Sequence, residues 1–333
     1  MTDARAEILA WVREGALPRE SLDAALRVTG ATPDAAQWRR FVEQLLVWLG
    51  AVLMAAALTY FVAANWQSLG RFAKFALVEA ALAASVAVAC WRSLDSLAGR
   101  AALLAAALTT GVLLALVGQA YQTGADTFEL FATWAILIVP WTLVGRQPAL
   151  WLLLVALADL AIVLYFRTNV ARGFGALDFV FAPRAALWCV IALNAAALVA
   201  WEIAGAARGG WLAVRWAPRL LATSVGAGVT FVAVLYVVAW WDRDTRGAEA
   251  LAAYAAFAAG MLWAYRVRTL DLYMLAGLAV SAIVLAAFAA ARVLLPNGGM
   301  FGFLLMALLI AGAAAAAAHA LRRLASQARE AAP

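Results

Sequence analysis

Long apolar runs, separated by short polar connections, dominate this chain from residue 45 onward. The runs match the roughly 20 helical residues that cross a hydrocarbon core of about 30 Å. They lack the alternation of polar and apolar positions that a membrane β-barrel requires. The pattern therefore predicts about ten transmembrane helices, near residues 45–65, 72–91, 101–120, 128–145, 148–166, 184–205, 218–241, 248–265, 269–291 and 300–321.

The first 43 residues have a different pattern, because charged residues are frequent and no long apolar run occurs. Partial apolar stripes, with Gly15 and Gly30 as stop signals, predict short helices there. The absence of a central apolar run also argues against a cleavable signal peptide. We expect a cytoplasmic helical head at 1–43, a transmembrane bundle at 44–322 and a cytoplasmic tail at 323–333.

Composition supports this division. Hydrophobic residues make up 67% of the chain and charged residues 13%, with a mean hydropathy of +0.89, whereas soluble domains carry about 25% charged residues. The expected fold class is an all-α, polytopic helical membrane protein surrounded by a lipid bilayer. The head holds six Arg against seven acidic residues, so it lacks the basic surface of a nucleic-acid-binding domain, and no nucleic acid partner is expected.

The distribution of Lys and Arg predicts the orientation, because basic residues concentrate in cytoplasmic loops. With the amino terminus inside, the cytoplasmic segments hold 17 basic residues and the opposite side holds 8. Both termini are therefore predicted to be cytoplasmic.

A dense polar segment, Gln119–Glu129, joins the third and fourth predicted spans on the outer side, in a connection without Lys or Arg. We call it the outer polar segment. The first span ends on the same side, and Asp242 and Asp244 follow the seventh span there. One interpretation is a capped surface loop; the other is a binding pocket, since exposed polar loops often carry function. The candidate outer-face site comprises Asn65, Trp66, Gln119, Tyr121, Gln122, Thr123, Asp126 and Glu129.

Acidic residues within the apolar runs form a second set of candidates. Glu79 lies in the second span, Asp159 in the fifth and Glu202 near the inner end of the sixth. A carboxylate in mid-membrane costs on the order of 3 kcal/mol, so it should face the bundle interior, become neutral or pair. Asp159 is the deepest and is either a hydrogen-bonded packing residue or a proton or cation site. Asn194 in the sixth span is expected to form an interhelical hydrogen bond.

The sequence gives no support for a catalytic or cofactor site. It contains no phosphate-binding Gly-rich loop, no dinucleotide fingerprint, and no metalloprotease or nucleophile-elbow motif. A single His and two distant Cys argue against a zinc or haem centre. We therefore expect no metal and no cofactor, and no catalytic residue can be named, which argues against an enzyme without excluding one.

Several motifs together resemble the bacterial membrane family catalogued as domain of unknown function 2157. The resemblance covers the head and the first four or five spans, and it implies a polytopic inner-membrane protein of bacteria without implying an activity. The motifs are Val62-Ala63-Ala64-Asn65-Trp66, Gly118-Gln119-Ala120-Tyr121-Gln122-Thr123-Gly124-Ala125-Asp126, Glu129-Leu130-Phe131 and Trp134.

Three functional hypotheses remain open at this point. The first is a transporter-like carrier, with Asp159 as the coupling acid and the outer polar segment as the substrate contact. The second is a non-catalytic scaffold or envelope sensor whose head binds a cytoplasmic protein. The third is a transferase acting on lipid-linked substrates through outer-face acids, although no recognisable acid–base pair supports it.

Overall fold

The computed structural model describes residues 8, 10–29, 35–39, 41–43, 45, 46, 60, 64, 66–122, 124, 126–169, 184–208, 210–238 and 246–330. Over these residues the chain forms helices and their connections, without a β-strand. The predicted all-α class is therefore confirmed. The chain divides into two compact units, Met1–Lys74 and Phe75–Pro333.

The described part of the first unit is helical. A 3-10 turn at Arg19–Ser21 leads into α2 (Leu22–Val28), and Ile8 and Leu26 are buried. Residues 35–39 and 41–43 are also helical. The predicted first span, residues 45–65, lies mostly outside the described residues.

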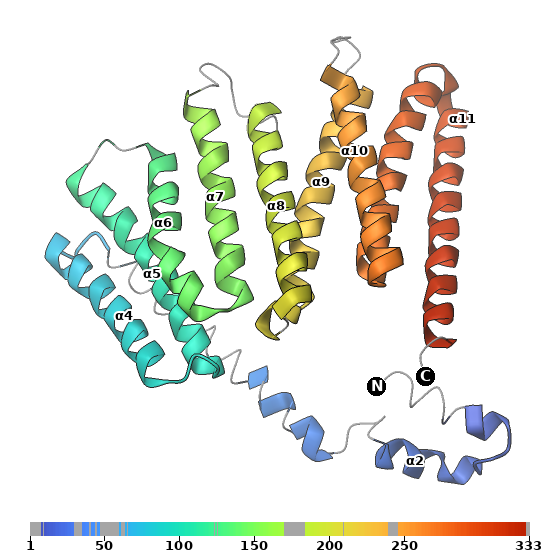
Figure 1. The fold of residues 1–333 in the computed structure, drawn as a ribbon, viewed down its shortest axis with the longest axis horizontal. Helices are drawn as coiled ribbons and strands as arrows, with labels where there is room; N and C mark the ends of the chain where they lie inside the picture. Colours follow the sequence, from blue (N-terminus) through green and yellow to red (C-terminus); the bar gives the residue numbers. More distant parts are fainter. Residues whose placement is uncertain are drawn as a thin grey trace. The chain divides into compact units, whose positions relative to one another are not determined.

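Nine helices of the described chain are long and apolar enough to cross a membrane. Figure 1 shows those of the second unit side by side, and they coincide with the second to tenth predicted spans to within a few residues. The final helix continues to Glu330, so most of the segment predicted as a tail extends this helix. The helices are α4 (Arg71–Trp91), α5 (Leu97–Tyr121), α6 (Thr127–Gly145), α7 (Pro148–Asn169), α8 (Arg184–Arg208), α9 (Trp216–Val238), α10 (Arg246–Leu262) with its π-helical continuation η4 (Trp263–Arg268), and the two halves of α11 (Leu272–Glu330).

Local sequence signals explain where these helices begin and end. The side chain of Ser96 caps α5 by accepting a hydrogen bond from the Gly99 amide at 3.0 Å. Arg146 follows α6 in a left-handed conformation with φ 42°, and Pro148 then begins α7, where a first-turn proline is favoured. The short connection between the fourth and fifth predicted spans is therefore a turn between two helices.

Neighbouring helices of the second unit pack against one another, and α9 lies at the centre of its carboxyl-terminal half. Helix α9 contacts α8, α10 and α11, and it has the largest buried share of the nine candidate spans. Large apolar side chains elsewhere point outward: Ile136 is 70% exposed and Leu308 is 61% exposed. Such a surface is unsuited to water and fits a bilayer, where apolar side chains face lipid tails.

Candidate functional site

Four charged side chains from helices far apart in the sequence form an ion-pair network. Arg215, just before α9, donates from Nη1 to both carboxylate oxygens of Glu202 on α8, at 3.0 and 3.1 Å. Its Nε and Nη2 donate to Oδ2 of Asp271 at 3.2 and 3.0 Å. Arg219 on α9 donates from Nε and Nη2 to the two oxygens of the same Asp271, at 3.2 and 3.1 Å. The network therefore joins α8, α9 and the start of α11.

Further groups complete the network. The Tyr265 hydroxyl in the π-helical turn η4 donates to Glu202 Oε1 at 2.9 Å. Asp271 also accepts from the backbone amide of Tyr273 at 3.0 Å, which caps the start of α11. Two arginines and two carboxylates balance in charge. The arrangement is typical of an ion-pair network that stabilises the packing of helices, and it leaves little unpaired charge for chemistry.

The network also determines the protonation of its members outside the spans. Burial disfavours the charged form of Arg215, but hydrogen bonds to Asp271 and the charge of Glu202 outweigh it and raise the pKa of Arg215. Burial likewise disfavours the Asp271 carboxylate, yet the hydrogen bonds from Arg215 and Arg219 hold the pKa of Asp271 below its ordinary value. Arg215 and Asp271 therefore remain ionised at neutral pH.

Asp159 lies near the middle of α7 in a different environment. The amide nitrogen of Asn194, on α8, donates to both carboxylate oxygens of Asp159, at 2.9 and 2.8 Å, and to the Val190 carbonyl at 3.0 Å. Asn194 is 3% exposed. The predicted interhelical hydrogen bond of Asn194 is confirmed, and its partner is the deepest acid of the chain. An amide, unlike an arginine, leaves the charge of a carboxylate uncompensated.

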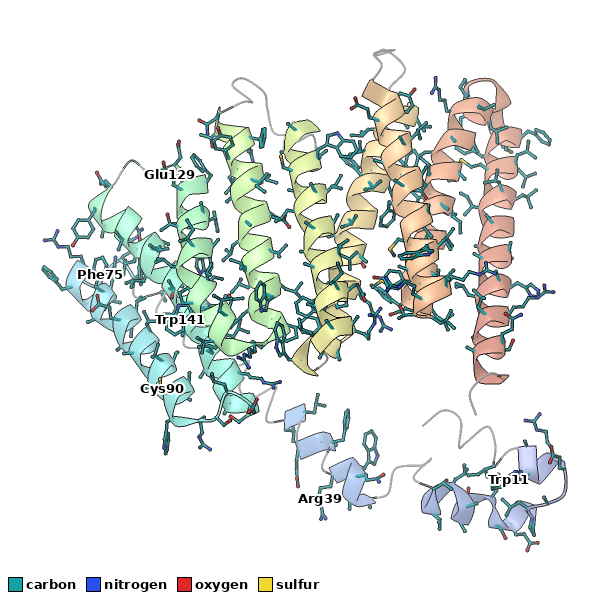
Figure 2. All side chains as sticks on the ribbon, viewed as in Figure 1. Trp11, Arg39, Phe75, Cys90, Glu129 and Trp141 are labelled. Carbon is teal, nitrogen blue, oxygen red and sulfur yellow. The ribbon has the colours of Figure 1, made fainter. Side chains whose placement is uncertain are left out.

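The outer polar segment joins α5 to α6 and exposes its side chains. Gln119, Tyr121, Gln122, Asp126 and Glu129 are all exposed. Asp126 occupies the N-cap position of α6 without a side-chain capping hydrogen bond, and Glu129 lies in its first turn, where a negative charge is favourable. Figure 2 shows Glu129 and Cys90 toward opposite ends of the second unit, as expected for opposite membrane sides.

The remaining candidates are not brought into a common site. Glu79 is exposed on α4. Trp66 belongs to the first unit, where the Lys74 ammonium lies 4.6 Å from the centre of its ring. Asn65, Thr123, Asp242 and Asp244 lie outside the described residues.

Sequence reasoning missed the ion-pair network. The sequence places Glu202 near the inner end of the sixth predicted span and counts Arg215 and Arg219 among the cytoplasmic basic residues, without indicating that these residues pair. Their i,i+4 spacing at the start of a span was an available signal for one shared partner. That the partner is Asp271, 52 residues further along, could not be read from a single sequence.

Comparison with known proteins supports the resemblance noted from the motifs. The family model described as predicted membrane protein (DUF2157) matches residues 9–151, which extend from the head to the start of α7. Comparisons with curated proteins and with solved structures gave no match. Asp159, Asn194 and the ion-pair network all lie beyond the matched range.

Proposed function

We propose that the protein is an inner-membrane carrier in which Asp159 binds and releases a proton or a small cation. The observation that carries this proposal is the pairing of Asp159 with the uncharged amide of Asn194 in the middle of two spans. Among the described residues, the ion pairs involve Asp95, Glu202 and Asp271 but not Asp159. A charged carboxylate at that depth is costly unless a proton or cation neutralises it.

The hydrogen-bond geometry around Asp159 suits a carboxyl group that gains and loses a proton or a cation. Asn194 holds both oxygens of Asp159 from one side at about equal distances, so the carboxyl can gain a proton or a cation while its position is retained. The second amide contact, to the Val190 carbonyl, keeps the Asn194 side chain in place in either state. A residue that served packing alone would not need an ionisable group here.

In this proposal the outer polar segment makes the first contact with the transported molecule. Its amides, phenol and carboxylates are exposed at the end of α5 and the start of α6, on the side predicted to be outer. Because the connection has no basic residue, it favours a neutral or cationic solute.

The proposal can be tested with Asp159→Asn in the purified full-length chain. A hydrophobic carbodiimide, which reacts with protonated carboxyl groups in apolar surroundings, should label Asp159 in the wild type, more at pH 6 than at pH 9. If sodium is the cation, added Na⁺ should protect the site. Asp95→Asn is the matched control, because the Asp95 side chain is 99% exposed.

Transport itself is measured in proteoliposomes under an imposed pH or sodium gradient. We expect a flux above that of protein-free liposomes, at least tenfold lower in Asp159→Asn and unchanged in Asp95→Asn. Equal flux in both variants, or carbodiimide labelling that ignores pH and Na⁺, would overturn the proposal.

A second candidate function, the scaffold with a partner-docking head, is favoured by one feature of the first unit. Trp38 and Phe41 stack with ring centroids 5.4 Å apart and are 60% and 52% exposed. Exposed aromatic pairs are frequent anchors at protein interfaces. Crosslinking in cells should then capture a cytoplasmic protein with the wild type and lose it in a Trp38→Ala, Phe41→Ala double variant.

A further inference from the structure

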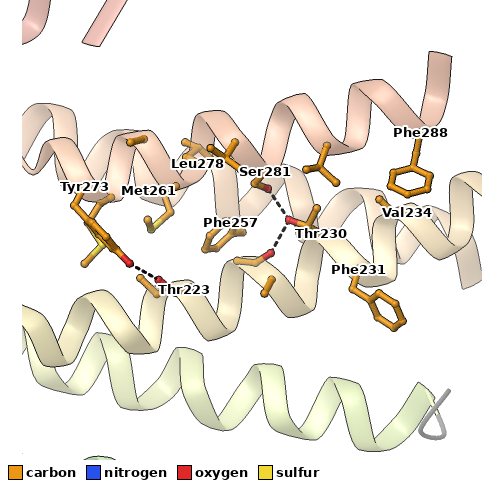
Figure 3. A pocket seen from close by; sticks show the side chains of 18 of the residues that line it. Thr223, Thr230, Phe231, Val234, Phe257, Met261, Tyr273, Leu278, Ser281 and Phe288 are labelled. Carbon is orange, nitrogen blue, oxygen red and sulfur yellow. Dashed lines mark hydrogen bonds between the residues drawn. The ribbon is translucent and has the colours of Figure 1, made fainter. Parts of the chain in front are cut away.

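An apolar groove lies between α9, α10 and the first half of α11, far from Asp159 in sequence and with no part in the proposed proton or cation binding. Its volume is about 760 Å³, and its lining is almost wholly apolar. Figure 3 shows Thr223 and Tyr273 at one end and Phe288 toward the other. Several lining side chains are open to the surroundings, with Val280 60% exposed and Phe288 46% exposed. The groove is therefore accessible from the bilayer.

Hydroxyl groups in the wall are satisfied internally. Thr230 donates to the Gly226 carbonyl at 2.6 Å, and the Thr230 and Ser281 oxygens lie 2.6 Å apart. Ser281 also donates to the Tyr254 hydroxyl at 3.1 Å. A water molecule needs two to four polar partners to reside in a cavity. Because these hydroxyls bond one another, the groove favours an apolar occupant over water.

The length of the groove suits a hydrocarbon chain of a lipid. Lining residues on α9 extend from Ala222 to Val238, which is roughly 24 Å at 1.5 Å per residue. The length also covers most of a hydrocarbon core of about 30 Å.

The positive charge at one end of the groove favours an anionic lipid headgroup. Arg219 lies over the ring of Tyr273, a lining residue, at 5.3 Å. Around this end the described chain contributes six arginines against two acids, Glu202 and Asp271. Leu321 and Leu324 pack on the buried apolar cluster that includes Met274, and they bring Arg322 and Arg323 to this end. A local excess of positive charge attracts anionic lipids. The arginines are Arg215, Arg219, Arg266, Arg268, Arg322 and Arg323.

We propose that this groove binds one chain of an anionic phospholipid, with the phosphate at the Arg219–Tyr273 end, in the leaflet that the basic-residue count predicts to be cytoplasmic. The Thr223 hydroxyl donates to the Arg219 carbonyl at 2.8 Å and lies 3.1 Å from the Tyr273 hydroxyl. The Tyr273 hydroxyl lies between the apolar wall and the arginines, where it can donate to an ester or phosphate oxygen of the lipid. The lipid is a bound component of the carboxyl-terminal half of the bundle.

Two glycines provide a matched pair of variants. Gly277 lines the groove, and a Cβ there would meet nothing within 4 Å, so Gly277→Leu can add bulk to the groove from an unobstructed Cβ. Gly260 on α10 is equally unobstructed and is not a lining residue. Gly260→Leu is therefore the control for the helix and for the added bulk.

The experiment uses the full chain in nanodiscs with phosphatidylglycerol that carries a diazirine on one acyl chain, and the same label on phosphatidylcholine. After photolysis, labelled peptides should map to α9 and α11 around Phe231, Val284 and Phe288. We expect at least fivefold more labelling from phosphatidylglycerol than from phosphatidylcholine. Gly277→Leu should lower that labelling at least fivefold, and Gly260→Leu should leave it within twofold of wild type.

Three outcomes would overturn the proposal: equal labelling by the two lipids, equal labelling of the two leucine variants, or crosslinks at these positions to a second copy of the chain. If Gly277→Leu loses its folded elution profile, Ala227→Leu on the α9 wall of the groove takes its place. Labelling of that variant at the wild-type level would then decide against lipid binding in the groove.

Discussion

Asp271 is the residue on which the ion-pair network depends most. It lies between two spans, is 5% exposed, and accepts hydrogen bonds from two guanidinium groups and from the backbone at the start of α11. Removing such a carboxylate leaves two partly buried arginines without their partner. The side chains of Arg215 and Arg219 are 36% and 39% exposed, which limits the cost because water can reach them.

The first prediction follows from this environment. Asp271→Asn should lower the free energy of unfolding at pH 7 by about 2 kcal/mol, the scale of hydrogen bonds to charged groups. Unfolding is measured by titrating SDS into detergent micelles and following helix content by circular dichroism. Asp95→Asn is the control, because its ion pair to Arg100 is exposed and 4.0 Å long; it should change the free energy of unfolding by less than about 0.5 kcal/mol.

The same residue predicts a pH dependence. Because the pKa of Asp271 is lower in the folded chain than its ordinary value of 3.8, its stabilising effect is complete above about that pH and is lost as the pH falls through the lowered pKa. The stability difference between wild type and Asp271→Asn should therefore stay constant from pH 7 to about pH 4 and narrow below it. A difference that already narrows between pH 7 and pH 5 would contradict this assignment.

At the scale of elements, hydropathy predicted the spans well because one helix crosses the bilayer independently of its neighbours. Contacts between helices were not predictable in the same way. Trp134 is one of the residues that carry the family resemblance, and its indole nitrogen donates to the Ala107 carbonyl at 2.8 Å while its ring packs on Gly111. Both partners lie on the preceding helix, and an apolar run does not show which of its faces meets the next helix.

The same limit applies to the candidate sites. The sequence singled out Asp159 and Asn194 separately, because each is polar in an apolar run, but only the packing of α7 on α8 makes them a pair. The apolar groove gave no sequence signal at all. Its lining is made of residues that any span contains, and its shape depends on how three helices leave space between them.

The break within α11 gives a prediction for a single element. Gly299 separates the two spans of this helix with φ 47° and ψ −140°, a conformation that residues with a Cβ rarely adopt. Gly299→Ala should therefore lower the free energy of unfolding by about 1–3 kcal/mol. Gly312→Ala is the control, because Gly312 lies in the regular second half of α11 with open space around it.

Gly312→Ala should be neutral or stabilise the helix by up to about 1 kcal/mol. Both variants are compared by the SDS titration described for Asp271. Equal stabilities of Gly299→Ala and wild type would show that the chain can turn between these spans without the positive φ.

At the scale of the whole molecule, the orientation of the bundle determines on which side each candidate site acts. The nine described spans alternate in direction, so the ion-pair network and the outer polar segment lie at opposite ends of the second unit. The basic-residue count predicts that the network end is cytoplasmic. With a first span at 45–65 the head would then lie on the cytoplasmic side too; without it, the head would lie outside.

Cysteine labelling tests this orientation in intact cells. In a background with Cys90→Ala and Cys189→Ala, a membrane-impermeant maleimide should label Asp126→Cys, in the exposed connection between α5 and α6, and should not label Asp95→Cys, between α4 and α5. Opening the cells should expose the second site to the same reagent. A cysteine at Glu14, in the exposed part of the head, should behave like Asp95→Cys if the first span exists. Labelling of Glu14→Cys from outside, with Asp95→Cys still protected, would mean an odd number of spans and would remove the head from the cytoplasm, where a docking partner is proposed.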